Sequence, residues 1–194
     1  MIYENTPTIE TKRLILRKFT EEDVHDFLKI MSDKEVNTFL PWFPLENLSE
    51  AKEFLEKNYL SYYEKASAYR YAICLKESNR PIGYVNLSGG ESNDFGYGLR
   101  KEFWHKGIVT EAAKTVIEKI KNAGYLYITA THDVNNPRSG EVMKRLGMSY
   151  CYSYIENWQP KDIFVTFRMY QLNFNKNDEQ IYMGYWNRYE NHFV

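Results

Sequence analysis

The chain has 194 residues, of which 43% are hydrophobic and 16% aromatic, and this composition suits one domain with one substantial core. Its net charge is −1 and its isoelectric point lies near 6.4, so the composition gives no electrostatic basis for binding nucleic acid or an anionic membrane.

The first third of the chain predicts one strand followed by helices. Residues 14–19 alternate between apolar and polar types, as a half-buried strand does. A capping box at residues 20–23 then opens a helix whose apolar side chains repeat at helical spacing. A short helix over residues 34–39, stopped by Pro41, and a longer helix over about residues 49–65 are expected next.

The rest of the domain alternates between strands and helices. Residues 69–75 and 82–87 predict the two strands of a hairpin. A strand over residues 94–99 leads through Gly107 into an amphipathic helix over residues 109–122. The remaining strands are expected at residues 125–132, 148–154 and 163–172, with a short helix from Asn136 between the first two.

The turn before the long helix is the most informative local feature. A helix that starts through a glycine leaves several backbone N–H groups without an intrahelical partner, and the helix dipole favours an anion there. Because Lys106 stands beside Gly107, the turn predicts a phosphate or pyrophosphate site. It is neither a Walker A loop nor a G-x-G-x-x-G fingerprint, and the alternative is that Gly107 only ends a loop.

A second segment, NPRSGEVMKRLGM, has matching chemistry. Asn136 fits the N-cap of a helix and Pro137 its first position, so one alternative is that Asn136 acts only as a cap. Ser139 in the first turn is a middling helix former. Because ligands of open α/β sheets bind beyond the ends of strands, Asn136 and Ser139 are candidate ligand-binding residues.

Residues 173–194 form a segment of a different kind. The polar stretch NKNDEQ is followed by the aromatic run IYMGYWNRYENHFV. This run predicts a docking arm, either onto the chain's own domain at residues 1–172 or onto a partner subunit in a homodimer. A frayed terminus is the alternative.

Several other classes of protein are not expected. The four histidines show no metal-ligand spacing, so no metal site is predicted. No N-terminal run resembles a signal peptide, and no segment is long enough to span a bilayer. Cys74 and Cys151 fall in predicted strands and indicate free thiols in a reducing compartment. The cytoplasm is therefore the expected location.

The order of these elements, with WHKGIVTEA in one motif and NPRSGEVMKRLGM in the other, resembles the GNAT superfamily of N-acetyltransferases. The segments TKRLILRKFTEED, PIGYVNL and DIFVTFRMYQL are similar to its branch of ribosomal-protein N-terminal acetyltransferases, the RimJ/RimL type. The resemblance runs from Ile9 to Leu172. It implies an α/β (α+β) fold with a mixed central sheet of about seven strands, splayed at the central strand, and four or five flanking helices.

Three positions depart from the family pattern. His105 replaces a common glycine, and Val109 replaces glycine or alanine, so bulk at Val109 would narrow the pyrophosphate seat. Met143 occupies the position at which many members carry a tyrosine general acid. A tyrosine mechanism from that position is therefore excluded, and Ser139 becomes the candidate proton donor.

The resemblance implies transfer of the acetyl group of acetyl-CoA, the co-substrate, to a primary amine by direct attack in a ternary complex. A backbone N–H near Leu99 would meet the acyl carbonyl oxygen as charge develops on it. Asn136 would bond the pantetheine, and Ser139 would face the sulfur. Arg138 or Lys144 would reach the 3′-phosphate. The pyrophosphate would bind the backbone amides of Lys106, Gly107, Ile108, Val109 and Thr110.

The general base is open at this stage. An acceptor amine must lose a proton that starts near a pKa of roughly 8 for an α-amine or about 10.4 for lysine. Asp94 lies where this branch often carries an acidic residue and would take the proton directly or through water. The alternative is that Asp94 only starts the strand, and Glu91 and His132 are further candidates. Ser139 and Asp94 are thus the predicted catalytic residues.

Two classes of function remain. The first is an N-acetyltransferase, for which the resemblance suggests a protein N-terminal amine as the acceptor. A small amine such as an amino acid, a polyamine or an aminoglycoside is the alternative acceptor. The loop at residues 40–45 and the helix after it would line the acceptor side. The second class is a sensor or interaction module that binds acetyl-CoA or CoA without turnover.

Overall fold

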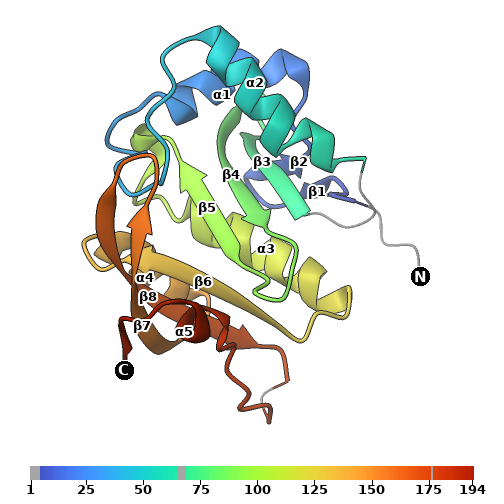
Figure 1. Cartoon of the computed structure of the whole chain (residues 1–194). Coiled ribbons are helices and arrows are strands. Elements are labelled where there is room, and N and C mark those ends of the chain that lie inside the picture. The colour runs from blue at the N-terminus through green and yellow to red at the C-terminus, as the bar shows by residue number, and fades with distance from the viewer. Residues whose placement is uncertain (1–4, 65–68, 176) are drawn as a thin grey trace.

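Two antiparallel sheets form the framework of the residues that the computed structural model describes, which are 5–64, 69–175 and 177–194 (Figure 1). The strands of the first sheet, in spatial order, are β1 (Ile9–Glu10), β2 (Leu14–Arg17), β3 (Tyr69–Leu75), β4 (Pro81–Leu87) and β5 (Phe95–Leu99). Those of the second sheet are β6 (Tyr127–Asp133), β8 (Ile163–Asn173), β7 (Ser149–Trp158) and β9 (His192–Phe193). An isolated parallel bridge between Asp94 and Thr129 joins the two sheets.

The helices cover both faces of this framework. In the described residues they are α1 (Val24–Met31), α2 (Leu48–Asn58), α3 (Ile108–Asn122), α4 (Pro137–Arg145) and α5 (Gly184–Arg188). Helices α1 and α2 pack on one face of the first sheet and α3 on the other, and α4 lies against the second sheet (Figure 1). None of these helices combines the length and apolar character that crossing a bilayer requires.

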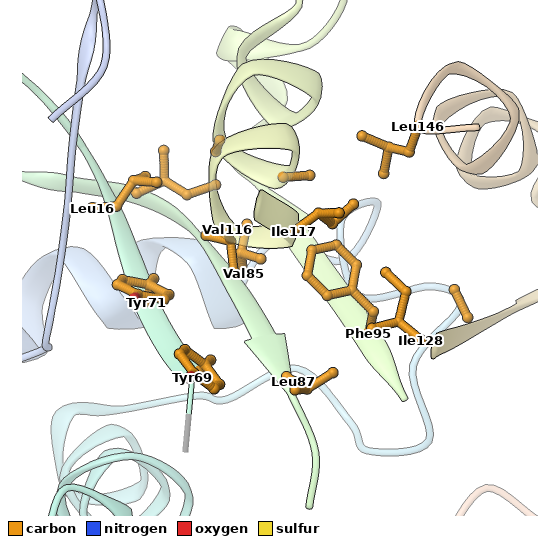
Figure 2. Packing of buried hydrophobic residues seen from close by; sticks show 14 of the residues in the cluster. Leu16, Tyr69, Tyr71, Val85, Leu87, Phe95, Val116, Ile117, Ile128 and Leu146 are labelled. Atoms are coloured by element: carbon orange, nitrogen blue, oxygen red, sulfur yellow. The ribbon is translucent and has the colours of Figure 1, made fainter. Parts of the chain in front are cut away.

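The main core runs from the first sheet across α3 to the second sheet. Figure 2 shows Ile117 of α3 close to Phe95, Val116 of the same helix toward β4, and Ile128 of β6 and Leu146 on the other side. These five residues belong to one buried cluster. Because the cluster draws on both sheets, α3 and α4 lie on the same side of the combined framework.

A second core lies between the first sheet and the helices α1 and α2. Alternate residues of β3 separate the two cores, since Tyr71 and Ile73 belong to the main core and Ala72 and Cys74 to the second. The two cysteines, Cys74 and Cys151, are both free thiols. The first sheet is thus covered on both faces.

The expected fold class is confirmed. Seven strands in the described residues are four or more residues long, as expected, and β1 and β9 are two-residue strands at the edges. The predicted helix over residues 34–39 is wrong, because this stretch forms turns. The Asn37 side chain donates to the carbonyls of Ile30 (3.0 Å) and Asp33 (2.8 Å), and such bonds compete with helix formation. Helix α2 ends at Asn58 and is followed by a 3-10 turn at Leu60–Tyr62, so the expected helix to about residue 65 is too long; residue 65 itself lies outside the described residues.

The C-terminal segment lies along β7 of its own chain. The Tyr152 hydroxyl donates to the carbonyl of Tyr182 at 2.7 Å, and the Ile155 amide donates to the carbonyl of Asn191 at 2.9 Å. Strand β9 then pairs antiparallel with β7. In Figure 1 this segment runs in front of the second sheet, and its helix α5 lies near β7.

Candidate functional site

The gap between β5 and β6 opens from one isolated bridge, between Asp94 and Thr129. The Thr129 amide donates to the carbonyl of Asn93 at 3.1 Å, and its hydroxyl donates to the carbonyl of Ser92 at 2.8 Å. Beyond the bridge at Asp94, β5 and β6 belong to different sheets and diverge (Figure 1). Asp94 therefore stands at the closed end of the gap.

Backbone amides of β5 face this gap. The Arg100 amide donates to the carbonyl of Ile82, which marks a hydrogen-bonded pair of the β4–β5 ladder. In an antiparallel ladder the intervening residues turn their N–H groups away from the partner strand, so Tyr97 and Leu99 direct theirs toward β6. The Leu99 carbonyl accepts a hydrogen bond from the Trp104 indole at 2.8 Å. The amide expected to meet an acyl oxygen is thus on the open side of the strand.

Glycine is required at the turn that starts α3. Gly107 is the N-cap and has φ 70°, a left-handed conformation that side chains disfavour. A Cβ there would meet a single neighbour within 4 Å, the Arg13 side chain at 3.8 Å. The first-turn amides of Ile108, Val109 and Thr110 have no intrahelical acceptor. The five predicted pyrophosphate ligands, Lys106 to Thr110, therefore do lie around one helix N-terminus.

Arg13, the residue just before β2, supports this turn and was not singled out in the sequence. Its guanidinium donates to the carbonyl of Lys106 at 2.9 Å and to the Glu111 carboxylate at 2.7 Å. The Thr11 hydroxyl donates to the same carboxylate at 2.6 Å. Arg13 sits in the segment TKRLILR, but only tertiary structure shows that it reaches the turn 93 residues away.

The two unusual residues of the turn have different consequences. His105 has φ 60°, which explains why a glycine suits this position. Val109 packs against the main core, so its bulk points away from the exposed end of the helix. The expected narrowing of the pyrophosphate seat is therefore not enforced by the Val109 side chain.

Ser139 lies on α4 against a tyrosine from β5. The Tyr97 hydroxyl donates to the carbonyl of Ser139 at 2.8 Å and lies 3.1 Å from its Oγ. Burial raises the pKa of Tyr97, which keeps this phenol protonated at neutral pH. The Asn136 side chain accepts from the Ser139 amide at 3.4 Å and so caps α4. Met143 is 1% exposed and lies in the core, where it has no proton to offer.

Asp94 is half-buried and has the environment of a proton acceptor. Burial raises its pKa to about 6, so the carboxylate is mostly ionised at neutral pH and still basic. His132 is 4% exposed and lies under α4, with its Nε2 2.7 Å from the place that a Cβ on Gly140 would take. Burial lowers the pKa of His132. Of these two groups, Asp94 is the one at the gap.

The two basic residues considered for the 3′-phosphate lie in different surroundings. The Arg138 guanidinium lies 5.1 Å from the centre of the Trp104 ring, whose indole binds Leu99 at the gap. Lys144 is paired with Glu141 at 2.8 Å on the exposed side of α4. Arg138 is therefore the nearer of the two to the mouth of the gap.

A surface hollow of about 810 Å³ lies elsewhere, between α3 and the β7–β8 strands. Its lining includes Lys114, Tyr150 and Asn173 and none of the residues predicted for the site. Along β5, by contrast, a Cβ on Gly96 would find nothing within 4 Å. The open backbone of β5, the free amides of α3 and the Asp94 carboxylate fit a long phosphorylated thioester and an amine better than the hollow does.

The sequence matches a known family over most of its length. Residues 13–149 match the family model described as "Acetyltransferase (GNAT) domain". The chain is 31% identical over 117 residues to the uncharacterized N-acetyltransferase p20 of Bacillus licheniformis, which covers 57% of this chain and 64% of that protein. It is 28% identical over 144 residues to the uncharacterized N-acetyltransferase YnaD of Bacillus subtilis strain 168. This match covers 72% of this chain and 81% of that protein. The chain thus spans less than two thirds of the first relative.

Solved structures share the fold. One is an acetyl transferase that modifies the N-terminal serine of the 50S ribosomal subunit protein L7/L12 from Salmonella typhimurium (TM-score 0.75, 17% identity, 87% of this chain and 100% of that chain). Another is the microcin C7 self immunity acetyltransferase MccE in complex with acetyl-CoA and AMP (TM-score 0.73, 18% identity, 84% and 93%). At these identities the likeness concerns the fold.

Proposed function

The chain belongs to the GNAT family of acetyl-CoA-dependent N-acetyltransferases, and from that premise we propose that its acceptor is the N-terminal amine of a protein. The observation that carries the assignment of roles is the gap between β5 and β6. Asp94 stands at its closed end, Ser139 lies on its α4 side, and the Gly107 turn is a receptor for phosphate.

We assign one task to each group around the gap. The amides at the start of α3 bind the pyrophosphate of acetyl-CoA, and the β5 amides of Tyr97 and Leu99 bind its pantetheine arm and acyl oxygen. Asn136, whose side chain caps α4, is the further pantetheine ligand expected from the resemblance. These contacts hold the thioester between the two sheets.

The reaction forms a bond between the amine nitrogen and the acyl carbon and breaks the bond between that carbon and sulfur. Asp94 accepts the proton that the amine releases, directly or through one water molecule. The Ser139 hydroxyl donates a hydrogen bond to the departing thiolate, and Tyr97 orients that hydroxyl. Atoms and charge balance with acetyl-CoA and the amine alone.

Two structures with the same fold and one exposed side chain support this choice of acceptor. The Salmonella protein with the same fold modifies an N-terminal serine, which favours a protein N-terminus. MccE shares the fold and has AMP bound, so a small amine is the competing acceptor class. Phe43, in the loop expected to line the acceptor side, is 59% exposed and can pack against a peptide.

Calorimetry with acetyl-CoA is the first experiment, with wild type beside Gly107→Glu. Micromolar binding that the added carboxylate abolishes supports the pyrophosphate site, because a negative charge would face the phosphates. Wild type that does not bind acetyl-CoA contradicts the assigned site.

The acceptor is tested with three sets of amines: peptides with a free N-terminus, the same peptides with a blocked N-terminus and an internal lysine, and small amines. Acetylation of the first set alone supports the proposal. Acetylation of small amines alone overturns the acceptor class. Binding of acetyl-CoA with no turnover on any set favours the sensor or interaction module, for which Met143 in place of a tyrosine leaves room. The cytoplasm remains the expected compartment, and the two free thiols are consistent with it.

A further inference from the structure

Strand alternation places the proton donor and the proton acceptor on opposite faces of β5. Leu99 packs in the main core, and Tyr97 reaches Ser139 on α4, so the odd-numbered side chains of β5 face α3 and α4. Asp94 and Gly96 therefore face the other side. With nothing within 4 Å of a Cβ on Gly96, an acceptor amine has open space beside Asp94 there.

The C-terminal segment covers this same side of the second sheet. Tyr154 of β7 is 2% exposed because tail rings stack on it. The ring of Tyr185 lies 5.1 Å from the Tyr154 ring at an interplanar angle of 18°, and that of Tyr189 lies 4.8 Å away at 7°. The side chain of Gln171 holds the start of the segment, since its Oε1 accepts from the Tyr182 amide at 2.8 Å.

The tail thereby brings phenols close to Asp94. Burial raises the pKa of Tyr154, Tyr182 and Tyr185, and the Asp94 charge raises each further. One of these tyrosines comes from β7 and the other two come from the tail. The other charges nearby are Glu91 and Arg188, and both act on Tyr182.

Tyr185 is the tail residue that we connect to the bridge. Its ring packs edge-on against Tyr182 at 5.3 Å, and Tyr182 stacks at 6.3 Å on Tyr127 of β6, the strand that carries Thr129. The side chains of Ser92 and Thr129, whose hydrogen bond closes the gap beside Asp94, also influence the pKa of the Tyr185 hydroxyl. For Tyr189, in contrast, the charged groups that shift the pKa of the hydroxyl are Glu156 and Arg188.

We propose that residues 180–193 build one wall of the acceptor site and that Tyr185 positions the Asp94 carboxylate by shielding it from water. A primary ammonium is attracted both by a carboxylate and by the faces of tyrosine rings, so this wall selects the cationic form of the acceptor. The inference rests on the proposed function, because it concerns the acceptor side of the same gap.

The test compares Tyr185→Ala with Tyr189→Ala. Both substitutions remove a phenol that stacks on Tyr154, but the proposal assigns the shielding of Asp94 to Tyr185 alone. Acetyl-CoA binding by calorimetry first establishes that each variant is folded, and Tyr185→Leu replaces the alanine variant if that one is not. The Asp94 carboxyl is then titrated by carbon-13 NMR, with Asp94→Asn identifying its signal.

The Tyr185→Ala variant is expected to lower the pKa of Asp94 by about one unit as water enters, and to raise the acceptor KM about fivefold. Tyr185→Phe keeps the ring and should restore the pKa. Tyr189→Ala should leave it unchanged. An unchanged pKa in Tyr185→Ala, or an equal fall in both alanine variants, overturns the assignment to Tyr185.

The two proposals fail in distinguishable ways. If wild type binds acetyl-CoA and acetylates no amine, the proposed function is wrong, whereas the NMR titration still reports whether the tail shields Asp94. If amines are acetylated and the Asp94 pKa does not respond to Tyr185, the enzyme assignment stands and the tail has no part in the acceptor site.

Discussion

Burial makes the Asp94 carboxylate costly to ionise, so Asp94→Asn should lower activity and raise stability. Asp94→Asn removes the proton acceptor and should lower kcat/KM roughly 100-fold or more, the usual contribution of a general base. The same change removes a buried charge and should raise the melting temperature at pH 7.5. Steady-state kinetics and thermal unfolding measure the two effects. A variant that loses stability together with activity would contradict the assignment.

The pH dependence of wild type follows from the same shift. The folded-state pKa of about 6 lies above the ordinary value of 3.8, so the folded protein binds more protons between these values. The contribution of Asp94 to the free energy of unfolding is therefore largest below pH 3.8 and is lost as the pH rises through about 6. Activity has the opposite pH dependence, since Asp94 must be ionised to accept a proton, and kcat/KM should fall as the pH drops below about 6. In Asp94→Asn both dependences should disappear.

Ser139 and Tyr97 form a pair whose substitutions should not add. Ser139→Ala should lower kcat about tenfold and leave acetyl-CoA affinity nearly unchanged, because the hydroxyl matters when the thiolate departs. Tyr97→Phe should have a smaller effect, since it only frees Ser139 to rotate. The double variant should be no slower than Ser139→Ala in single-turnover kinetics. Additive losses would show that Tyr97 acts independently of Ser139.

Candidate site residues could be predicted from the sequence where they lie in a local motif. Asn136 and Ser139 stand out because the N-cap, the proline and the helix start are adjacent in the chain. Tyr97 and Arg13 were not predictable in these roles, because their partners lie 42 and 93 residues away. A strand tyrosine and an arginine near a chain terminus carry no local sign of such contacts.

At the scale of elements, the start of α3 depends on its contacts with Arg13, the residue just before β2. Arg13→Ala should raise the dissociation constant of acetyl-CoA about five- to tenfold, because its guanidinium holds the Lys106 carbonyl and the Glu111 carboxylate beside the turn. Arg13→Lys should restore little, since an ammonium cannot make both contacts in one plane. Calorimetry measures both affinities.

Lys12→Ala is the matched control for Arg13. Lys12 is exposed, and its substitution by alanine removes the same charge one residue away from Arg13. If Lys12→Ala weakens acetyl-CoA binding as much as Arg13→Ala does, the effect is one of net charge and the geometry of the turn is irrelevant. If only Arg13→Ala weakens it, the contacts carry the effect.

Some elements with a clear hydrophobic period were predicted to within one residue at their starts, whereas β7 extends four residues beyond its predicted end at residue 154. Strand β3 was predicted at its observed bounds, and α3 begins one residue before its predicted start. The helix expected over residues 34–39 failed because Asn37 turns its side chain onto the backbone of the preceding turn, and a buried asparagine looks in sequence like a solvated one.

At the scale of the molecule, the splay between β5 and β6 could be expected only from the resemblance. The pattern of β5 and β6 is that of two ordinary strands, and nothing in it says that they meet at one bridge. The second sheet has one face in the main core and the other under the tail, and this division is likewise a tertiary property. It depends on Ile128 sharing a core with Phe95, while Tyr154 shares one with the tail.

We expect the tail to stabilise its own chain and not to join subunits, because its large rings already contact residues of the same chain. Trp186 packs against Tyr152 at 5.5 Å and against His192 at 3.9 Å within one chain. Trp186→Ala should therefore lower the free energy of unfolding by about 2 kcal/mol, as loss of a half-buried aromatic side chain does. It should leave the mass measured by light scattering unchanged. If instead the mass halves while the melting temperature holds, the tail joins two subunits, and the homodimer expected as one alternative is the correct assembly.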